Sequence, residues 1–188
     1  MHIIIIIMFV LEAQTRAPDV LIRPCRVEDA PAMFGAVRES MDDLIRWMPW
    51  CHQDYSLQES KSWLRTQVQA FNERKWFEFA IVDPGGGYLG QCGLNQIDEA
   101  NRRCNLGYWV RSSATGHGVA TRAVLMTRDW GFEHTNLARI EIVVALGNRR
   151  SVRVAEKAGA LREGVLQQRL LLHGVQEDAV MFSFVRRR

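Results

Sequence analysis

One stretch decides the fold of this 188-residue chain: Thr115-Gly116-His117-Gly118-Val119-Ala120-Thr121. It follows a strand-like run, Asn105–Val110, and opens a helix-like run, Arg122–Phe132. Glycine lets the backbone approach an anion closely, and the first N–H groups of a helix have no acceptor within that helix. A strand, a glycine turn and a helix start in this order therefore predict a phosphate-binding site. A tight turn that only caps the helix is the alternative.

A second polar element, Asn148-Arg149-Arg150-Ser151, follows the next strand-like run and strengthens this interpretation. Asn148 and Ser151 are three residues apart in an expected helix, so they share one face near its start. Asn148 after Gly147 is also a good N-cap residue, and capping is compatible with contact to a ligand.

Composition excludes two classes of partner. The chain has 24 basic and 21 acidic side chains, and its net charge of +3 gives no support for nucleic-acid binding. Hydrophobic residues make up 47% of it, as in ordinary globular domains, and the apolar run near the start is too short to span a bilayer. We therefore expect no nucleic-acid partner and no membrane partner.

The four cysteines, Cys25, Cys51, Cys92 and Cys104, show no metal-binding or disulfide pattern. No Cys-x-x-Cys occurs, and a chain of this size does not need disulfide bonds for stability. We expect reduced thiols, no metal site and a cytoplasmic protein.

Residues 1–19 are treated as a separate N-terminal segment and residues 20–188 as one domain. In the segment, Met1-His2 is followed by the isoleucine run Ile3–Ile7. Histidine-tag codons read one base out of frame encode isoleucine, so one interpretation is that part of the segment is tag-derived and that native sequence starts near Met8. A genuine edge strand is the alternative, and neither interpretation enters the functional argument.

Periodicity and turn residues predict an α/β (α+β) domain in which strands and helices alternate. Strands are expected at Val20–Cys25, Trp76–Val82, Tyr88–Ile97, Ala138–Leu146, Val165–Leu172 and Gln176–Val185. A further strand is expected to follow the turn Asp98–Asn101 and to end at Val110. Helices are expected from Glu28 to about Met41, around Trp47–Trp50, and at Leu57–Asn72, Arg122–Phe132 and Asn148–Ala158, the last ended by Gly159. This order predicts a mixed, mostly antiparallel twisted sheet of about six or seven strands, flanked by about four helices.

These residues resemble the GNAT family of N-acetyltransferases. The order strand, Thr-Gly-His-Gly-Val-Ala, helix, strand, Asn-x-x-Ser-x-x-x-x-x-Lys-x-Gly is similar to the family's acyl-CoA site. A late Asp178 and four further motifs are similar to its RimJ/RimL-like branch, which includes acetylases of ribosomal-protein N-termini: Leu21-Ile22-Arg23-Pro24, Trp47-Met48-Pro49-Trp50, Leu106-Gly107-Tyr108-Trp109-Val110 and Glu156-Lys157-Ala158-Gly159-Ala160. The resemblance covers about residues 20–185 and implies the GNAT fold.

The resemblance also implies the donor and the residues that hold it. The co-substrate would be acetyl-CoA or another acyl-CoA, with its pyrophosphate on the turn residues Thr115, Gly116, His117, Gly118, Val119, Ala120 and Thr121. The strand end at Tyr108, Trp109 and Val110 would pair with the pantetheine arm, and the Val110 N–H would hold the thioester oxygen as it becomes an oxyanion. Ser151 is the candidate proton donor to the departing thiolate, and Asn148 a hydrogen-bonding partner of the arm.

Trp47 and Trp50 occupy positions that line the acceptor pocket in similar proteins. Aromatic walls exclude water and shape a cleft. Packing in the hydrophobic core is an equal alternative for both residues. Similar proteins often form homodimers, and nothing in this sequence favours or excludes a dimer.

The chain departs from the donor-site pattern of the family at two positions. Thr115 stands where Gln or Arg usually begins the glycine motif, so Arg111 or Arg122 is the candidate to replace a lost phosphate contact. Ala155 stands where many members have a proton-donating Tyr.

No obvious general base remains in the sequence. Leu170 stands where ribosomal-protein acetylases carry a Glu, and the pair Asn105-Leu106 replaces an acidic residue that often precedes Gly-Tyr-Trp. Glu141 is the candidate to order a catalytic water, and a structural salt bridge to Arg139 is its alternative.

The missing base bears on the acceptor. An α-amine with a pKa of about 8 needs roughly 1.4 kcal/mol to be neutral at pH 7, whereas lysine at about 10.4 needs about 4.6 kcal/mol. A weak base therefore suits an α-amine or another weakly basic nitrogen. We expect acetyl transfer to a primary amine, on a protein N-terminus or a small molecule, by direct attack in a ternary complex. A non-catalytic acyl-CoA-binding module is the alternative.

Overall fold

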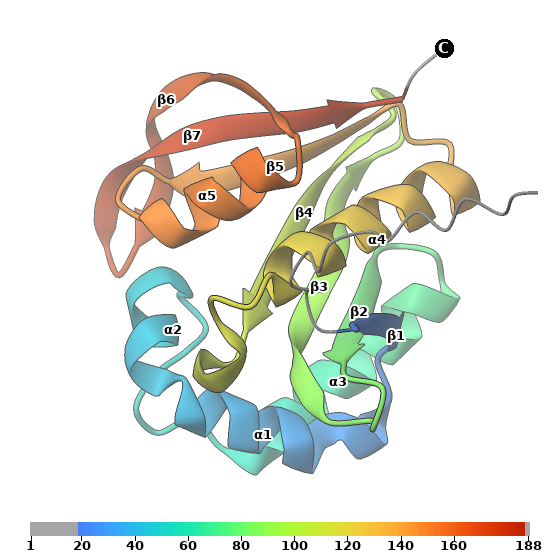
Figure 1. Cartoon of the computed structure of the whole chain (residues 1–188), viewed down its shortest axis with the longest axis vertical. Helices are drawn as coiled ribbons and strands as arrows, with labels where there is room; N and C mark the ends of the chain where they lie inside the picture. The colour runs from blue at the N-terminus through green and yellow to red at the C-terminus, as the bar shows by residue number, and fades with distance from the viewer. Residues whose placement is uncertain (1–18, 187–188) are drawn as a thin grey trace, which may run out of the picture.

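The computed structural model describes residues 19–186, and these form one sheet flanked by helices (Figure 1). The isoleucine run, with its tag and edge-strand interpretations, lies outside the described residues. The strands are β1 (Leu21–Pro24), β2 (Phe77–Val82), β3 (Tyr88–Asp98), β4 (Arg103–Val110), β5 (Arg139–Ala145), β6 (Leu161–Leu172) and β7 (Val175–Val185). Their order is β1-β2-β3-β4-β5-β7-β6, and only β4 and β5 pair in parallel. The mixed, mostly antiparallel sheet is confirmed.

Within residues 19–186, five α-helices accompany the sheet: α1 (Ala30–Glu39), α2 (Met41–Trp47), α3 (Leu57–Asn72), α4 (Val119–His134) and α5 (Arg149–Lys157). Short 3₁₀ turns precede α1 at Val27–Asp29 and α4 at Ser112–Ala114. None of the helices described is long and apolar enough to cross a membrane.

Several element boundaries differ from the sequence prediction. The helix expected around Trp47–Trp50 was wrong: α2 ends at Trp47, because Met48 precedes Pro49 and is extended. The helix expected to run from Glu28 to Met41 is interrupted at Ser40, whose Oγ accepts the Ser112 N–H at 2.9 Å. Helix α4 begins at Val119 because Gly118 has a left-handed φ of 81° and ends the preceding turn. Strand β6 begins at Leu161, earlier than Val165, because Leu161 already pairs with Ser183 of β7.

Strand alternation divides the interior into two hydrophobic clusters on opposite faces of the sheet. On one face, buried side chains such as Phe79, Leu106 and Phe182 pack beneath α4 and α5. On the other, Ala80 and Trp109 pack with α1, α2 and α3 in a second cluster. Figure 1 shows α4 and α5 on one side of the sheet and α1 and α2 together at its lower end.

The two parallel strands separate partway along their length. Only Arg103–Asn105 of β4 pairs with Arg139–Glu141 of β5. Beyond these residues β4 continues to pair with β3 and β5 with β7, while Figure 1 shows the two strands diverging. One edge of residues 106–110 is therefore left without a partner strand in the described sheet.

Candidate active site

A cavity of about 520 Å³ opens where β4 and β5 separate. The segments 106–109 of β4 and 142–145 of β5 line its two sides, and Asn148 and Ser151 line it from α5. Aromatic side chains close the opposite side: Trp47, Trp50, Tyr55 and Trp63. The structure thus brings six of the expected site residues together around one space: Trp47, Trp50, Tyr108, Trp109, Asn148 and Ser151.

The free edge of β4 presents alternate backbone N–H groups to this space. The Arg111 N–H donates to the Leu89 carbonyl of β3 at 2.8 Å. Because successive N–H groups of a strand point to opposite edges, the Val110 N–H points away from β3, toward the gap. This direction is the one that the expected oxyanion contact requires.

Ser151 is held in the cavity by two contacts. Its hydroxyl lies 2.8 Å from the Tyr108 hydroxyl, which also approaches the Ser151 carbonyl oxygen at 3.1 Å. Asn148 accepts the Ser151 N–H through Oδ1 at 3.1 Å, so the expected N-cap is confirmed. Burial raises the pKa of Tyr108 to about 12, which keeps the phenol protonated. The sequence indicated a backbone role for Tyr108 and did not reveal this side-chain contact.

The glycine turn has the geometry of an anion site. Gly116 and Gly118 both have left-handed φ angles, 83° and 81°, and Gly118 is the N-cap residue of α4. The N–H groups of Val119, Ala120 and Thr121 belong to the first helical turn, where no intrahelical acceptor exists. The Thr115 hydroxyl donates backwards to the Ser112 carbonyl at 2.8 Å, so backbone groups dominate the exposed turn.

The acetyltransferase (GNAT) domain model matches residues 19–161 of the chain. The chain belongs to the GNAT acetyltransferase family. Its sequence is 33% identical over 172 residues to "Putative ribosomal N-acetyltransferase YdaF" of Bacillus subtilis, across 89% of this chain and 92% of the relative. By family and by relatives it is an N-acetyltransferase.

Solved GNAT structures superpose on the whole domain. Ribosomal-protein-S5-alanine acetyltransferase from Vibrio fischeri has a TM-score of 0.80 and 25% identity, covering 88% of this chain and 92% of that one. Mycobacterium smegmatis RimJ, in complex with CoA-disulfide, has a TM-score of 0.79 and 28% identity, covering 90% and 83%. The GNAT fold expected from the sequence is confirmed.

Arg111 has a different role from the one expected of it in the GNAT turn. Its guanidinium donates to the Glu39 carboxylate and to the Tyr88 carbonyl, the latter at 3.1 Å. The Ser113 N–H also donates to Glu39, at 2.9 Å. These contacts fasten the loop before the glycine turn to the end of α1, and they engage Arg111 away from a phosphate.

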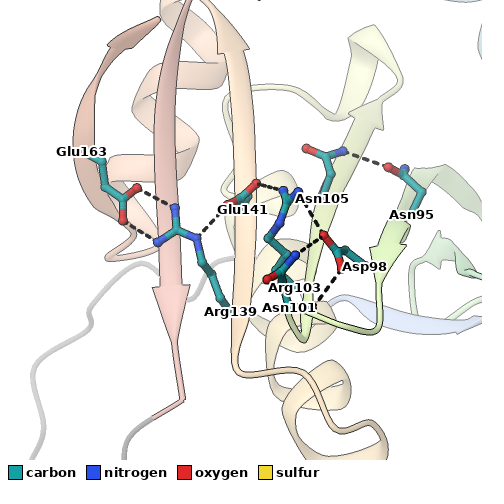
Figure 2. A network of polar contacts seen from close by, with 8 residues as sticks. All are labelled: Asn95, Asp98, Asn101, Arg103, Asn105, Arg139, Glu141 and Glu163. Carbon is teal, nitrogen blue, oxygen red and sulfur yellow. Dashed lines mark hydrogen bonds and ion pairs between the residues drawn. The ribbon is translucent and has the colours of Figure 1, made fainter.

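Glu141 has the contacts of a structural ion pair. Its carboxylate accepts from Arg139 Nε at 2.7 Å and from Arg103 at 3.3 Å (Figure 2). It lies on the last paired position of β4 and β5 and is not among the residues that line the cavity. The salt bridge proposed as its alternative role is therefore present, while a catalytic water at Glu141 stays a prediction without support from this geometry.

Glu78 is a functional candidate that the sequence reasoning missed. It lies on β2, lines the same cavity, and its carboxylate has no hydrogen bond or ion pair to any residue in the described part of the chain. Burial raises the pKa of Glu78 to about 8. The available signal was an acidic residue between Phe77 and Phe79, in the middle of a strand that is otherwise buried.

Proposed function

We propose that this GNAT protein transfers an acetyl group from acetyl-CoA to a primary amine, by direct attack in a ternary complex. The observation that carries the proposal is the shared cavity. It joins the free edge of β4 and the Ser151 hydroxyl to an aromatic-walled space on the other side. Donor and acceptor would therefore meet without a covalent intermediate on the protein.

The donor half of the proposal is supported by backbone geometry. The segment 106–110 offers free N–H and C=O groups to an extended arm, as an added strand would require. The turn at Gly116 and Gly118 aims first-turn amides of α4 at a pyrophosphate. When bound, acetyl-CoA supplies an activated acyl group as a thioester, and the Val110 N–H is placed to stabilise charge on its oxygen.

Ser151 supplies the proton that the departing thiolate needs. Its hydroxyl is the polar group of α5 that faces the splayed strands. The Tyr108 phenol lies 2.8 Å away and can replace the lost proton. This pair takes the place of the proton-donating Tyr that many members carry and that is Ala155 here.

The acceptor half is formed by aromatic side chains that are also packed against the fold. Trp50 is 38% exposed, and its ring lies 6.1 Å from Trp109 and 5.7 Å from Tyr55 between centroids. The Trp47 ring lies beside Gly147, next to Asn148, so it contacts the loop that starts α5. Packing at both positions is therefore compatible with contact to an acceptor. A protein N-terminus is supported by the ribosomal name of YdaF, and a small amine is the second acceptor class.

Purified protein, acetyl-CoA and a panel of amines test the proposal. N-terminal peptides and polyamines serve as acceptors, free thiol release is measured, and acetyl-CoA affinity is determined separately by calorimetry. We expect thiol release that depends on an acceptor and that falls in Ser151→Ala without loss of acetyl-CoA binding. Tight acetyl-CoA binding with no release for any acceptor would favour a non-catalytic binding module.

A further inference from the structure

We propose that Glu78 is the general base that takes a proton from the acceptor amine before the amine attacks the thioester. The proposal rests on the function proposed above and assigns the role that the sequence left without a residue. It differs from a water held by Glu141, because Glu78 lines the cavity and Glu141 does not.

Strand register places Glu78 in one row with two glycines, and this row runs across the sheet to the strand edge at the gap. Glu78 pairs with Gly93 on β3, and Gly93 pairs with Gly107 on β4. Residues directly opposite each other share a face of the sheet, so the three form one row across it. Neighbouring strands lie about 4.8 Å apart, so the backbone of Gly107 lies two strand spacings, roughly 10 Å, from that of Glu78 across the sheet.

Neither glycine adds a side chain to this row, and the Asn95 and Asn105 amides lie within 4 Å of the position that a Cβ on Gly107 would take. The Glu78 carboxylate lies over Gly93, in the space that a Cβ at that position would need. Gly107 adds no side chain either, and it lines the cavity at the edge of the gap. The Glu78 carboxylate and Gly107, at the free edge of β4, line the same cavity, so an acceptor amine bound in it would lie near both.

The surroundings of Glu78 leave its carboxylate available to a ligand. From α3 the neighbouring side chains are Trp63 and Gln67, and from β3 they are Gln91 and Asn95. Three other charged groups line the same two cavities. Glu59 pairs with His52 and Lys75 with Glu73, and Glu99 is exposed at the second cavity. This contrasts with Glu141, whose carboxylate is occupied by two arginines.

The nearby titratable groups do not compete for the proton near neutral pH. Burial holds the pKa of the Cys25 and Cys92 thiols and of the Tyr88 phenol above their ordinary values, so all three stay neutral. Glu78 itself has a pKa of about 8 through burial, close to the value of about 8 for an α-amine. Proton transfer between two groups of similar pKa costs little free energy. The positive charge of an acceptor ammonium in the cavity further favours the carboxylate form of Glu78.

The proposed step balances as follows. One proton of the ammonium moves to the Glu78 carboxylate, and the freed nitrogen lone pair forms a bond to the carbonyl carbon. The carbon–sulfur bond then breaks with its electron pair on sulfur, which receives a proton from Ser151. Ser151 is reprotonated, through Tyr108, by the second proton that the nitrogen loses on becoming an amide, and Glu78 releases the first proton to solvent.

Glu78→Gln tests the proposal because it keeps the size of the side chain and removes its basicity. With an ordinary primary amine we expect kcat to fall about 100-fold or more, with unchanged affinity for acetyl-CoA. With trifluoroethylamine, which is already neutral at the assay pH, the loss should shrink to less than 10-fold. The rate of the variant on the ordinary amine should also rise tenfold for each pH unit, following the fraction of free amine.

Two further variants complete the experiment. Glu133→Gln makes the same charge change at the exposed end of α4 and should keep wild-type kcat. Glu78→Asp keeps a carboxylate and should recover at least a tenth of wild-type kcat, including where Glu78→Gln fails to fold.

The outcomes separate this proposal from the proposed function. If the wild-type protein turns over and the kcat of Glu78→Gln is within twofold of the wild-type value, the role of Glu78 alone is overturned. An equal loss of kcat for the ordinary amine and for trifluoroethylamine overturns it too. Glu78→Asp no better than Glu78→Gln also overturns it. No turnover by the wild-type protein with any amine overturns the proposed function and this proposal together.

Discussion

At the scale of single residues, the chemistry proposed for this protein depends on side chains whose partners lie on other elements. Tyr108 on β4 contacts Ser151 on α5, and Glu78 on β2 lies over Gly93 on β3. Ser151 could be identified from its motif because a local pattern marks it. The contact to Tyr108 and the environment of Glu78 could not, since both depend on how strands far apart in sequence come together.

The contact between Tyr108 and Ser151 gives a direct prediction. Tyr108→Phe removes the hydroxyl 2.8 Å from Ser151 Oγ and should lower kcat about 10-fold, because the serine loses its proton partner. The KM for acetyl-CoA should change little, since the backbone of β4 remains. Steady-state thiol release measures both values.

Tyr88→Phe is the matched control for Tyr108→Phe. The Tyr88 hydroxyl is buried and has no hydrogen-bond partner among the described residues, so the same atom is removed without breaking a contact. Its kcat should remain at the wild-type value. A fall in kcat of similar size in both variants would contradict a specific role for the phenol of Tyr108.

At the scale of elements, the start of α4 is the part of the chain that we propose to bind the donor. Gly116→Ala places a side chain at a φ of 83°, where nothing crowds the added Cβ but the backbone conformation is strained. We expect a loss of about 1 kcal/mol in stability and at least a 10-fold weaker affinity for acetyl-CoA. Calorimetric titration and urea unfolding check the two effects.

Gly86→Ala provides the control because it introduces the same backbone strain in a turn outside the proposed donor site. Gly86 has a φ of 86° in the turn between β2 and β3, and its added Cβ also meets nothing within 4 Å. This variant should lose similar stability and keep wild-type affinity for acetyl-CoA. Equal weakening of affinity in both variants would mean that the glycine turn does not hold the donor.

Element boundaries show what the sequence could and could not reveal. Helix α3 was predicted at its observed bounds from its apolar positions, and in the structure a capping box of Ser56 and Glu59 marks its first residue. The interruption between α1 and α2 was not predicted, because Ser40 accepts the N–H of Ser112, far away in the sequence. Local signals determine the first boundary, whereas a tertiary contact determines the second.

At the scale of the whole molecule, ion pairs join elements that lie far apart in the sequence. Arg139 on β5 links Glu141 to Glu163 of β6 (Figure 2). Arg111, near the end of β4, links Glu39 of α1 to the loop before the glycine turn. The parallel pairing and the glycine turn were predictable from sequence. The partners in these ion pairs were not, because they depend on how segments far apart in the sequence are aligned in the fold.

These ion pairs predict how stability depends on pH. Hydrogen bonding to Arg139 lowers the pKa of Glu163 to about 2, and hydrogen bonding to Arg111 does the same for Glu39. Unfolded glutamate has a pKa of about 4.3, so the stabilisation is complete above that pH and is lost as the pH falls toward 2. The urea midpoint should therefore decrease across this range.

Glu163→Gln tests the assignment, because it removes one of the two carboxylates. Its urea midpoint should be lower than that of the wild-type protein at pH 6 and should decrease less between pH 5 and pH 2. An unchanged pH slope would show that the contact with Arg139 contributes nothing to stability.

The mass of an acceptor peptide after incubation with protein and acetyl-CoA tests the central claim most directly. The peptide carries a free N-terminus and an internal lysine, and fragmentation locates any added group. We predict the gain of one acetyl group on the α-amine, because an α-amine with a pKa of about 8 loses its proton more readily near pH 7 than a lysine with a pKa of about 10.4. An unchanged mass for this peptide and for every small amine offered, with acetyl-CoA bound, would contradict it.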